Sequence, residues 1–437
     1  MNKSFYIATM GCQMNEYDSE FLAQQLMEYG YAPADDPESA DIVLINTCTV
    51  REKADQKAMS LLGRLTRIKA KKGADMVLGV AGCLAQKQGQ RLFDRFPQLD
   101  LIMGPRELTK IREILDPVLF QQRKMLATRL DLPPLNASKT HQIQKGQVCA
   151  YVSIMQGCDN FCTYCIVPYV RGREISRPPG DILQEARLLV DQGVKEITLL
   201  GQNVNSYFWE GPGNSYTFPS LLEMLGHIPG LLRLRFTTSH PKDLSDNLIR
   251  CFQDMEVLCP HLHLPFQAGS NSVLERMKRG YTREHYLDLV DKLRDAVPHI
   301  AITSDVMVGF PGESHADFEQ TLDLMKKIRF DALFSFKYSD REGTVAAQLH
   351  EKVGEKEKRD RLKVLQSLQK EITLQKNKTL EGKRVAVLVE GQSKKGAQLM
   401  GRTATNKIVN FPRDKGNMGD IVNVVVKTAF INSLKAE

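Results

Sequence analysis

The chain has 437 residues, of which 42 % are hydrophobic and 25 % charged; this composition is typical of globular proteins, and the length predicts two or three domains. No apolar run approaches the roughly 18 residues of a membrane span, and the first residues lack the apolar core of a secretory signal, so we expect a cytoplasmic protein without membrane attachment. The net charge is +7, and residues 376–437 account for all of it, with 12 Lys and Arg against 5 Asp and Glu. This excess favours a polyanion-binding tail over a merely solvated basic face.

Residues 1–120 alternate strand and helix patterns. Strands are predicted at 4–11, 40–47, 75–82 and 99–104, each followed by a helix-like stretch. This alternation predicts a parallel α/β sheet. Residues 121–148 are polar and rich in turn-forming residues, which predicts a linker between domains.

The alternation resumes in residues 149–375 for six more strand and helix units. The predicted strands lie in 150–157, 196–201, 231–238, 261–267, 300–309 and 332–339. Six units are two short of a complete barrel, so we predict a partial, open (βα)6 barrel. An open side would leave room for a large substrate.

The last 62 residues change to the two-residue period of strands. Residues 383–391 alternate apolar and polar side chains, and 419–430 are rich in β-branched residues, with Gly and Asn turns between them. A small all-β barrel is therefore predicted, and its basic charge favours RNA binding.

Three cysteines stand close together in "GCDNFCTYC", at C-x3-C-x2-C spacing: Cys158, Cys162 and Cys165. A structural zinc site needs four ligands, but no C-x2-C or H-x3-H pair completes the set. Cys149 lies before the predicted strand, at its opposite end. Three thiolates suit an iron–sulfur cluster that leaves one iron open for another ligand.

A second set of cysteines is dispersed through the first domain. Cys12, Cys48 and Cys83 each fall just past the carboxyl end of a predicted strand. Because those ends share one edge of a parallel sheet, we expect the three thiols to meet there; the alternative is three unrelated core thiols. Gly11 and Gly82 would allow the backbone to approach a bulky cluster.

The first motif, with an aromatic residue before its last cysteine, resembles the signature of the radical S-adenosylmethionine (SAM) enzymes. "MGCQMNEYDSE", "NTCTVREKA" and "GCLAQ" are similar to the three cysteine motifs of the methylthiotransferase family, and "HLHLPFQAGSNSVLERMKRGYTR" and "SDVMVGFPGE" to its barrel motifs. The tail resembles the TRAM RNA-binding module. This resemblance covers nearly the whole chain and implies a methylthiotransferase domain (1–120), a linker (121–148), a radical SAM domain (149–375) and a TRAM domain (376–437).

The resemblance implies two [4Fe-4S] clusters. Cys158, Cys162 and Cys165 would hold the cluster whose open iron binds SAM, and the dispersed trio would hold an auxiliary cluster. Two SAM molecules would be used per turnover, one to methylate a sulfur at the auxiliary cluster and one to supply a 5′-deoxyadenosyl radical.

The implied reaction is methylthiolation at C2 of N6-isopentenyl (dimethylallyl) adenosine at tRNA position 37, next to the anticodon. The residues around the first two cysteines are most similar to the branch with this substrate. Branches that act on threonylcarbamoyladenosine in tRNA or on a ribosomal-protein aspartate are alternatives, and from another class, so is a non-catalytic RNA-binding module with structural metal. Expected partners are tRNA with prenylated adenosine and an electron donor such as flavodoxin or ferredoxin, and the enzyme is expected to be a monomer.

Further cofactor-binding residues are implied by position. Tyr164 sits where the superfamily contacts the adenine of SAM. The polar residues after the second and fourth barrel strands are candidates to bind the cofactor, or are loop-stabilising amides: Gln202, Asn203, Asn205, Gln267 and Ser270.

No catalytic residue beyond the cluster ligands is predicted, because radical hydrogen abstraction needs no general base. We interpret His240, His261 and His263 as core or capping residues. Arg171 and Arg173 are candidates to contact RNA phosphate or a cofactor carboxylate, with a surface ion pair as the alternative.

Overall fold

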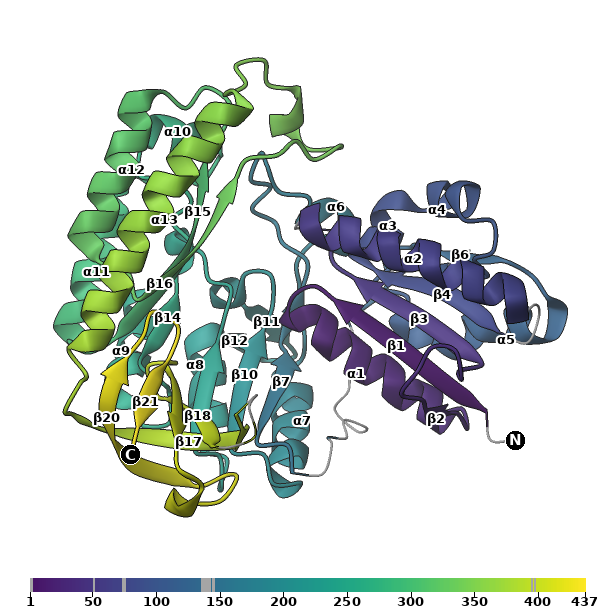
Figure 1. Cartoon of the computed structure of the whole chain (residues 1–437), viewed down its shortest axis with the longest axis horizontal. Coiled ribbons are helices and arrows are strands. Elements are labelled where there is room, and N and C mark those ends of the chain that lie inside the picture. Colours follow the sequence, from purple (N-terminus) through teal and green to yellow (C-terminus); the bar gives the residue numbers. More distant parts are fainter. Residues whose placement is uncertain are drawn as a thin grey trace.

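The structure is a computed structural model that describes residues 3–49, 52–72, 76–134, 143, 146–393, 396 and 398–437. An N-terminal α/β domain lies to one side of a central barrel domain, and a small C-terminal β-barrel packs beneath the central one (Figure 1). None of the helices in these ranges is long and apolar enough to cross a membrane.

The N-terminal domain is built on a six-stranded parallel sheet in the order β2-β1-β3-β4-β5-β6. Its strands are β1 (Ser4–Met10), β2 (Ala32–Pro33), β3 (Ile42–Thr47), β4 (Val77–Gly82), β5 (Leu101–Met103) and β6 (Met125–Ala127). The central strands β3 and β4 are buried along their whole length, as parallel strands covered on both faces require.

Helices cover both faces of this sheet and make two separate cores. The helices are α1 (Gln13–Glu28), α2 (Glu52–Lys72), α3 (Cys83–Gln88), α4 (Gln90–Arg95) and α5 (Ile111–Gln121). Side chains of α1 and α5 pack on one face, and those of α2 and α4 on the other. The parallel sheet is thus confirmed, but the sequence pattern missed the two short edge strands. One of them, β6, lies within the stretch predicted as a linker; of that stretch, residues 135–142 and 144–145 lie outside the described residues.

The central domain contains the six predicted parallel strands, in two sheets ordered β13-β10-β7 and β14-β15-β16. They are β7 (Cys149–Ser153), β10 (Glu196–Leu200), β13 (Arg233–Phe236), β14 (His261–His263), β15 (Ala301–Val308) and β16 (Ala332–Lys337). A bridge between Leu234 and Leu258 joins the two halves, while β7 and β16 end the series. The partial, open barrel is therefore confirmed.

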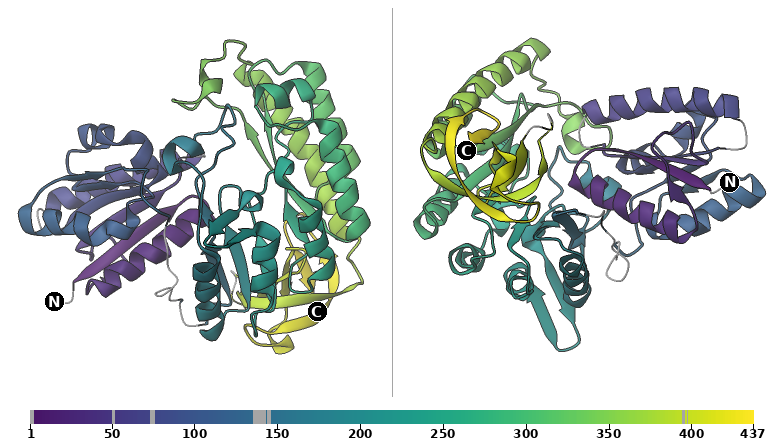
Figure 2. Two further views of the ribbon diagram at one scale, coloured as in Figure 1. Left: turned by 180° about the vertical axis from the view of Figure 1, so that it is seen from behind. Right: turned by 60° about the horizontal axis from the view of Figure 1, so that its bottom comes forward.

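Helices surround this barrel on the outside (Figure 2). They are α7 (Pro179–Asp191), α8 (Phe218–Gly226), α9 (Asp246–Asp254), α10 (Asn271–Arg276), α11 (Arg283–Ala296), α12 (His315–Ile328) and α13 (Glu355–Lys378). The short helix α6 (Val167–Arg171) instead lies against α3 of the N-terminal domain (Figure 1). Two small ribbons decorate the loops: β8 (Met155–Gln156) with β9 (Ile175–Ser176), and β11 (Phe208–Gly211) with β12 (Asn214–Thr217). The first ribbon flanks the C-x3-C-x2-C loop on both sides.

The C-terminal domain is a closed five-stranded barrel, as predicted, in the order β17-β18-β19-β21-β20. Its strands are β17 (Arg384–Gln392), β18 (Leu399–Thr403), β19 (Ile408–Phe411), β20 (Ile421–Ala429) and β21 (Leu434–Ala436). It docks on the N-terminal ends of the central strands, where Arg233 and Arg235 of β13 donate hydrogen bonds to backbone carbonyls of Arg402, Thr403 and Ala404. The small barrel therefore forms the floor of the large one.

Candidate active site

The dispersed cysteines Cys12, Cys48 and Cys83 come together at one edge of the N-terminal sheet. Strand register explains this, because Met10 at the end of β1 pairs with Thr47, and Thr47 pairs with Gly82 at the end of β4. Cys12 caps α1, Cys48 directly follows β3, and Cys83 begins α3. The backbone therefore brings the three cysteines together at the carboxyl ends of the strands, as expected from the sequence.

The glycines beside these cysteines serve protein packing. A Cβ on Gly11 would lie 2.6 Å from the Cβ of Cys48, and one on Gly82 would lie 2.4 Å from the Oδ1 of Asn46. Both glycines also have positive φ, at 153° and 89°, which side chains other than glycine rarely adopt. Asn46 is hydrogen-bonded to Asn15 on α1, so the cysteine loops are held by a buried amide pair. The glycines are thus required by neighbouring side chains; that they also allow the approach to a cluster stays a prediction.

Charge and burial act on these thiols in opposite directions. A hydrogen bond with Cys48 lowers the pKa of Cys12 to about 6; burial opposes this, and Arg171 assists it. Burial raises the pKa of Cys83, and Arg171 again lowers it in part. A thiolate is the form of cysteine that binds metal, and the lowered pKa of Cys12 favours that form at neutral pH.

The second trio, Cys158, Cys162 and Cys165, lies in the loop between β8 and α6, above the barrel. Burial raises the pKa of Cys158 to about 11 and that of Cys165 to about 12. The guanidinium of Arg279 places its Nη1 3.4 Å from the Sγ of Cys162 and donates through Nη2 to the carbonyl of Pro265 at 2.9 Å.

A cavity of about 710 Å³ connects the dispersed trio with the inside of the barrel and with the C-terminal domain. Its upper end is lined by Cys12, Cys48, Cys83 and Arg171, and its lower end by loops of the C-terminal barrel around Lys407. Cysteines of the second trio do not line this cavity. They are connected to it through Gln202, a lining residue whose Oε1 accepts a hydrogen bond from the backbone N–H of Gly157 at 2.5 Å.

The other predicted cofactor residues differ in how far their polar atoms are already used. Asn205 exchanges both hydrogen bonds of a pair with the backbone of His240, as a loop-stabilising amide does. Asn203 donates to Asp243 at 2.7 Å, but its Oδ1 is buried without a partner among the described residues. Gln202 and Asn203 therefore keep more capacity for a ligand than Asn205.

The two candidates after the fourth barrel strand, Ser270 and Gln267, also differ in how far their side-chain polar atoms are already hydrogen-bonded. Ser270 is buried and gives its hydroxyl to Asp317, which fixes it to α12. Gln267 has positive φ (64°) and pairs through its backbone with β15, while its side chain stays half-buried.

Tyr164 packs edge-on against Phe310 of the "GFPGE" turn, at 6.5 Å between ring centres.

The core and capping roles expected of the three histidines describe them only in part. His240 accepts a hydrogen bond from the N–H of Lys242, and burial lowers its pKa to about 2. Burial also lowers the pKa of His261, to about 3. Both His261 and His263 contact Thr303 and line the cavity, so they also form part of its inner wall.

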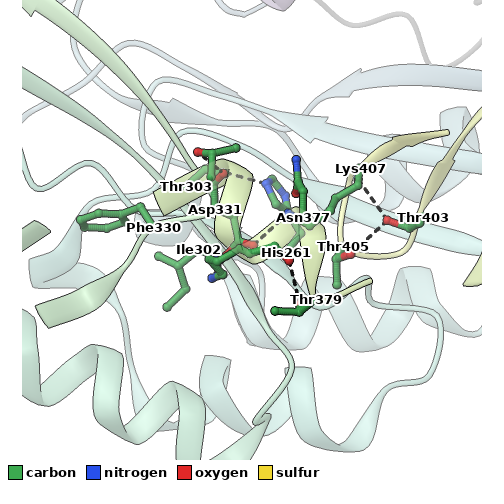
Figure 3. Close-up of polar contacts among 12 residues, drawn as sticks. His261, Ile302, Thr303, Phe330, Asp331, Asn377, Thr379, Thr403, Thr405 and Lys407 are labelled. Carbon is green, nitrogen blue, oxygen red and sulfur yellow. Dashed lines mark hydrogen bonds and ion pairs between the residues drawn. The ribbon is translucent and has the colours of Figure 1, made fainter. Parts of the chain in front are cut away.

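The floor of the cavity is a charged junction of three elements (Figure 3). Asp331 receives hydrogen bonds from Lys376 of α13 at 2.5 Å and from Lys407 of the C-terminal barrel at 3.0 Å. Asn377 donates to the carbonyls of Phe430 and Ile431, again between α13 and the C-terminal barrel. Both lysines were counted among the basic residues that suggested a polyanion-binding tail, but both are engaged by Asp331, and Lys407 docks the C-terminal barrel.

Two buried arginines, Arg106 and Arg171, connect the first domain to the cluster loop; sequence reasoning did not single out Arg106 and did not predict the burial of Arg171. Arg106 donates to the carbonyls of Leu132, Gln156, Arg171 and Arg173. Arg171 pairs with Asp18 on α1 at 2.7 Å, and both side chains are buried. The alternative of a surface ion pair holds for Arg173, which pairs with Asp159 at the exposed surface. Nothing in the periodicity marks an arginine as buried.

Comparisons with known proteins define the class of this fold and site. The radical SAM superfamily model matches residues 152–325, the uncharacterized protein family UPF0004 matches 4–104, and the TRAM domain matches 378–437. The TsrM radical SAM methyltransferase of Kitasatospora setae, with cobalamin and a [4Fe-4S] cluster, has a similar fold: its TM-score is 0.58 at 14 % identity, over 79 % of this chain and 74 % of that one. The central domain is that of a radical SAM enzyme.

Full-length relatives narrow the class. The tRNA-2-methylthio-N(6)-dimethylallyladenosine synthase of Syntrophus aciditrophicus is 51 % identical over 100 % of this chain and 94 % of its own length. The protein of the same name from Geobacter sulfurreducens is 48 % identical over 100 % of this chain and 97 % of its own. The chain belongs to this family of radical SAM tRNA methylthiotransferases.

Membership in the radical SAM superfamily implies a [4Fe-4S] cluster and SAM, and the donor set of the C-x3-C-x2-C loop fits them. It offers three soft thiolate donors on one loop and leaves the fourth cluster position to a ligand. Within the described residues, no three His, Cys, Asp or Glu side chains are arranged around one metal ion. A cluster differs from a single ion because each cysteine ligates a different iron.

Proposed function

We propose that this protein converts N6-dimethylallyladenosine at tRNA position 37 to its 2-methylthio derivative. The observation that carries the proposal is the single cavity that begins at Cys12, Cys48 and Cys83, passes Gln202 beside the C-x3-C-x2-C loop, and enters the barrel. A base in this cavity could be reached from both cysteine trios, as a reaction that removes hydrogen and adds sulfur at one carbon requires.

Each trio then holds one [4Fe-4S] cluster: Cys158, Cys162 and Cys165 the one that binds SAM, and Cys12, Cys48 and Cys83 the auxiliary one. When bound, these groups supply a 5′-deoxyadenosyl radical and a methylated sulfur, with two SAM molecules consumed per turnover. The low pKa of Cys12 favours ligation, and the arginine next to each trio supplies positive charge beside the thiolates.

The protein's own residues position the reactants. Tyr164, Gln202 and Asn203 are the best-supported candidates for binding SAM. Tyr164 belongs to the cluster loop and packs on Phe310, Gln202 lines the cavity, and the Oδ1 of Asn203 has no partner among the described residues. For Asn205, Gln267 and Ser270 the same role is proposed with less support, because their polar groups serve the fold or have no cavity position. The junction around Asp331 holds the C-terminal barrel at the lower end of the cavity.

The tRNA would be held by the C-terminal domain through basic residues that docking leaves free. Lys383 and Arg384 at the start of β17, and Lys435 of β21, are exposed. The substrate base must leave the anticodon stack to reach a cavity inside the protein. We further propose a cytoplasmic monomer that receives electrons from flavodoxin or ferredoxin.

The experiment is nucleoside mass spectrometry after anaerobic reaction of the iron-reconstituted protein with prenylated tRNA. A product 46 mass units heavier, the replacement of H by SCH3, supports the proposal. If only threonylcarbamoyladenosine in tRNA or a ribosomal-protein aspartate is modified, the sibling assignment holds in its place. An iron-free protein that binds tRNA without reaction would identify a non-catalytic binding module.

A further inference from the structure

Arg171 belongs to the barrel domain, but its side chain ends at the cysteine trio of the other domain. It is the last residue of α6, six positions after Cys165, and its backbone carbonyl is fixed by Arg106. From there the side chain reaches Asp18 on α1, with Nη2 to Oδ2 at 2.7 Å. Only 3 % of its side-chain surface is exposed, so this position is part of the buried wall.

One terminal nitrogen of this guanidinium, Nη1, is buried and has no oxygen or nitrogen acceptor among the described residues. Arg171 lines the cavity together with Cys12, Cys48 and Cys83. Its charge lowers the pKa of Cys12 and of Cys83, and a hydrogen bond with the Cys83 thiol lowers the pKa of Cys83 further. A buried guanidinium that already faces thiol sulfur is suited to bind an anionic sulfur ligand.

Positive charge is scarce in this cavity. Of the described residues that line it, the only permanent cations are Arg171 and Lys407, and Lys407 pairs with Asp331 at the opposite end. An anion that enters beside the trio therefore meets Arg171 as its sole cationic donor among those residues.

We infer that Arg171 binds the anionic sulfur that is transferred, a hydrosulfide or methanethiolate, through its Nη1 beside the auxiliary cysteines. This inference rests on the proposed function and adds an anion-binding residue to it. An anion whose charge lies on a single sulfur atom suits Nη1 alone, because Asp18 already occupies Nη2 and a carboxylate would need both nitrogens for a two-pronged contact. An RNA phosphate is excluded by the burial of the side chain.

The test measures affinity for sodium methanethiolate, using the EPR signal of the reduced auxiliary cluster. The background carries Cys158→Ala, Cys162→Ala and Cys165→Ala, so that one cluster contributes to the spectrum. Arg171→Gln is made together with Asp18→Asn, so that no carboxylate is left buried without its partner. We expect affinity to fall about tenfold to a hundredfold at unchanged iron content. Arg171→Lys, which keeps the charge, should recover part of it, and Arg173→Gln, an exposed arginine of the same loop, should leave affinity unchanged.

Three results would overturn the inference. Methanethiolate affinity within twofold of the parent would show that Arg171 does not bind sulfur. Loss of the auxiliary irons in Arg171→Lys as well would make the residue a structural support. An acetate affinity that depends on Arg171, with methanethiolate unaffected, would assign the position to a carboxylate. The proposed function fails separately, if the parent protein forms no auxiliary cluster or yields no methylthiolated nucleoside.

Discussion

Arg171 and Asp18 form an ion pair, 2.7 Å long and buried on both sides, between the barrel domain and helix α1 of the N-terminal domain. The pair ties the α6 helix, which follows one cysteine trio, to the helix capped by Cys12 of the other. The relative position of the two trios is therefore set by a direct side-chain contact as well as by the chain between them.

Breaking this pair from one side should loosen the domain contact strongly. Asp18→Asn leaves a buried guanidinium without its counter-charge, which typically costs about 3–5 kcal/mol, whereas the double change with Arg171→Gln should cost less than the two single changes added. Hydrogen exchange of the α1 amides measures this free energy. Additive effects of the two changes would show that the pair makes no coupled contribution.

Cysteine variants should separate the two halves of the chemistry. Alanine at Cys12, Cys48 or Cys83 should reduce bound iron from about eight to about four per protein and abolish sulfur insertion, while SAM cleavage continues. Iron analysis and 5′-deoxyadenosine release measure both. Cys251→Ala, in the barrel core and outside both trios, is the matched control and should keep all iron. If a variant of the first trio stopped SAM cleavage, the division of roles would be wrong.

Asp331→Asn should weaken the docking of the C-terminal barrel. The change keeps the shape of the side chain but removes the charge that Lys376 and Lys407 share, at a cost of about 2–4 kcal/mol. Faster hydrogen exchange in β18 and β19 is the expected readout. Glu437→Gln breaks an exposed pair with Lys427 and should change little, because pairs in solvent contribute at most about 1 kcal/mol. Equal exchange in both variants would contradict the role given to Asp331.

Glu174 should make stability depend on pH. Burial raises its pKa to about 7 from the ordinary 4.5, with further contributions from Asp159 and Asp243 against a hydrogen bond from Ser206. The folded state thus binds the proton more tightly, so the stability from this group is fully present below pH 4.5 and is lost as pH rises through 7. Between pH 5 and 8 the Tm of the parent should fall relative to that of Glu174→Gln. Parallel Tm curves would show that this carboxyl does not carry the effect.

Exposed basic residues of the small barrel should control the salt dependence of tRNA binding. Lys383→Gln with Arg384→Gln should lower affinity for all tRNAs alike and reduce the slope of log K against log salt by up to about 2. Arg187→Gln, an exposed change on α7, serves as the control. An unchanged slope would mean that the RNA lies on another surface.

Sequence patterns predicted the strands that carry the dispersed cysteines because β1, β3 and β4 are apolar runs that end at or next to a glycine or cysteine. Parallel connections between the strands then place their carboxyl ends at one edge of the sheet. This brings Cys12, Cys48 and Cys83 together although they are far apart in the sequence. The edge strands β2 and β6 were missed, since two or three residues carry no measurable period.

Burial of charged groups could not be predicted in this way. Arg106, Arg171 and Arg279 stand among other basic residues in the sequence, and only the approach of two domains or of a loop makes them interior. The docking role of Lys407 has the same origin, because its partner Asp331 lies in another domain. The charge count of residues 376–437 therefore favoured a polyanion as the ligand, but it overstated how many of these cations are free to bind one.

The central claim is that two cysteine trios act on one base inside one cavity. The most direct measurement is mass spectrometry of nucleosides from prenylated tRNA, reacted anaerobically with the reconstituted parent and with its Cys48→Ala variant, alongside iron analysis. We predict 2-methylthio-N6-dimethylallyladenosine with about eight irons for the parent, and unmodified nucleoside with about four irons for the variant. Methylthiolation by the Cys48→Ala variant, or a parent with only one cluster that still inserts sulfur, would contradict the account.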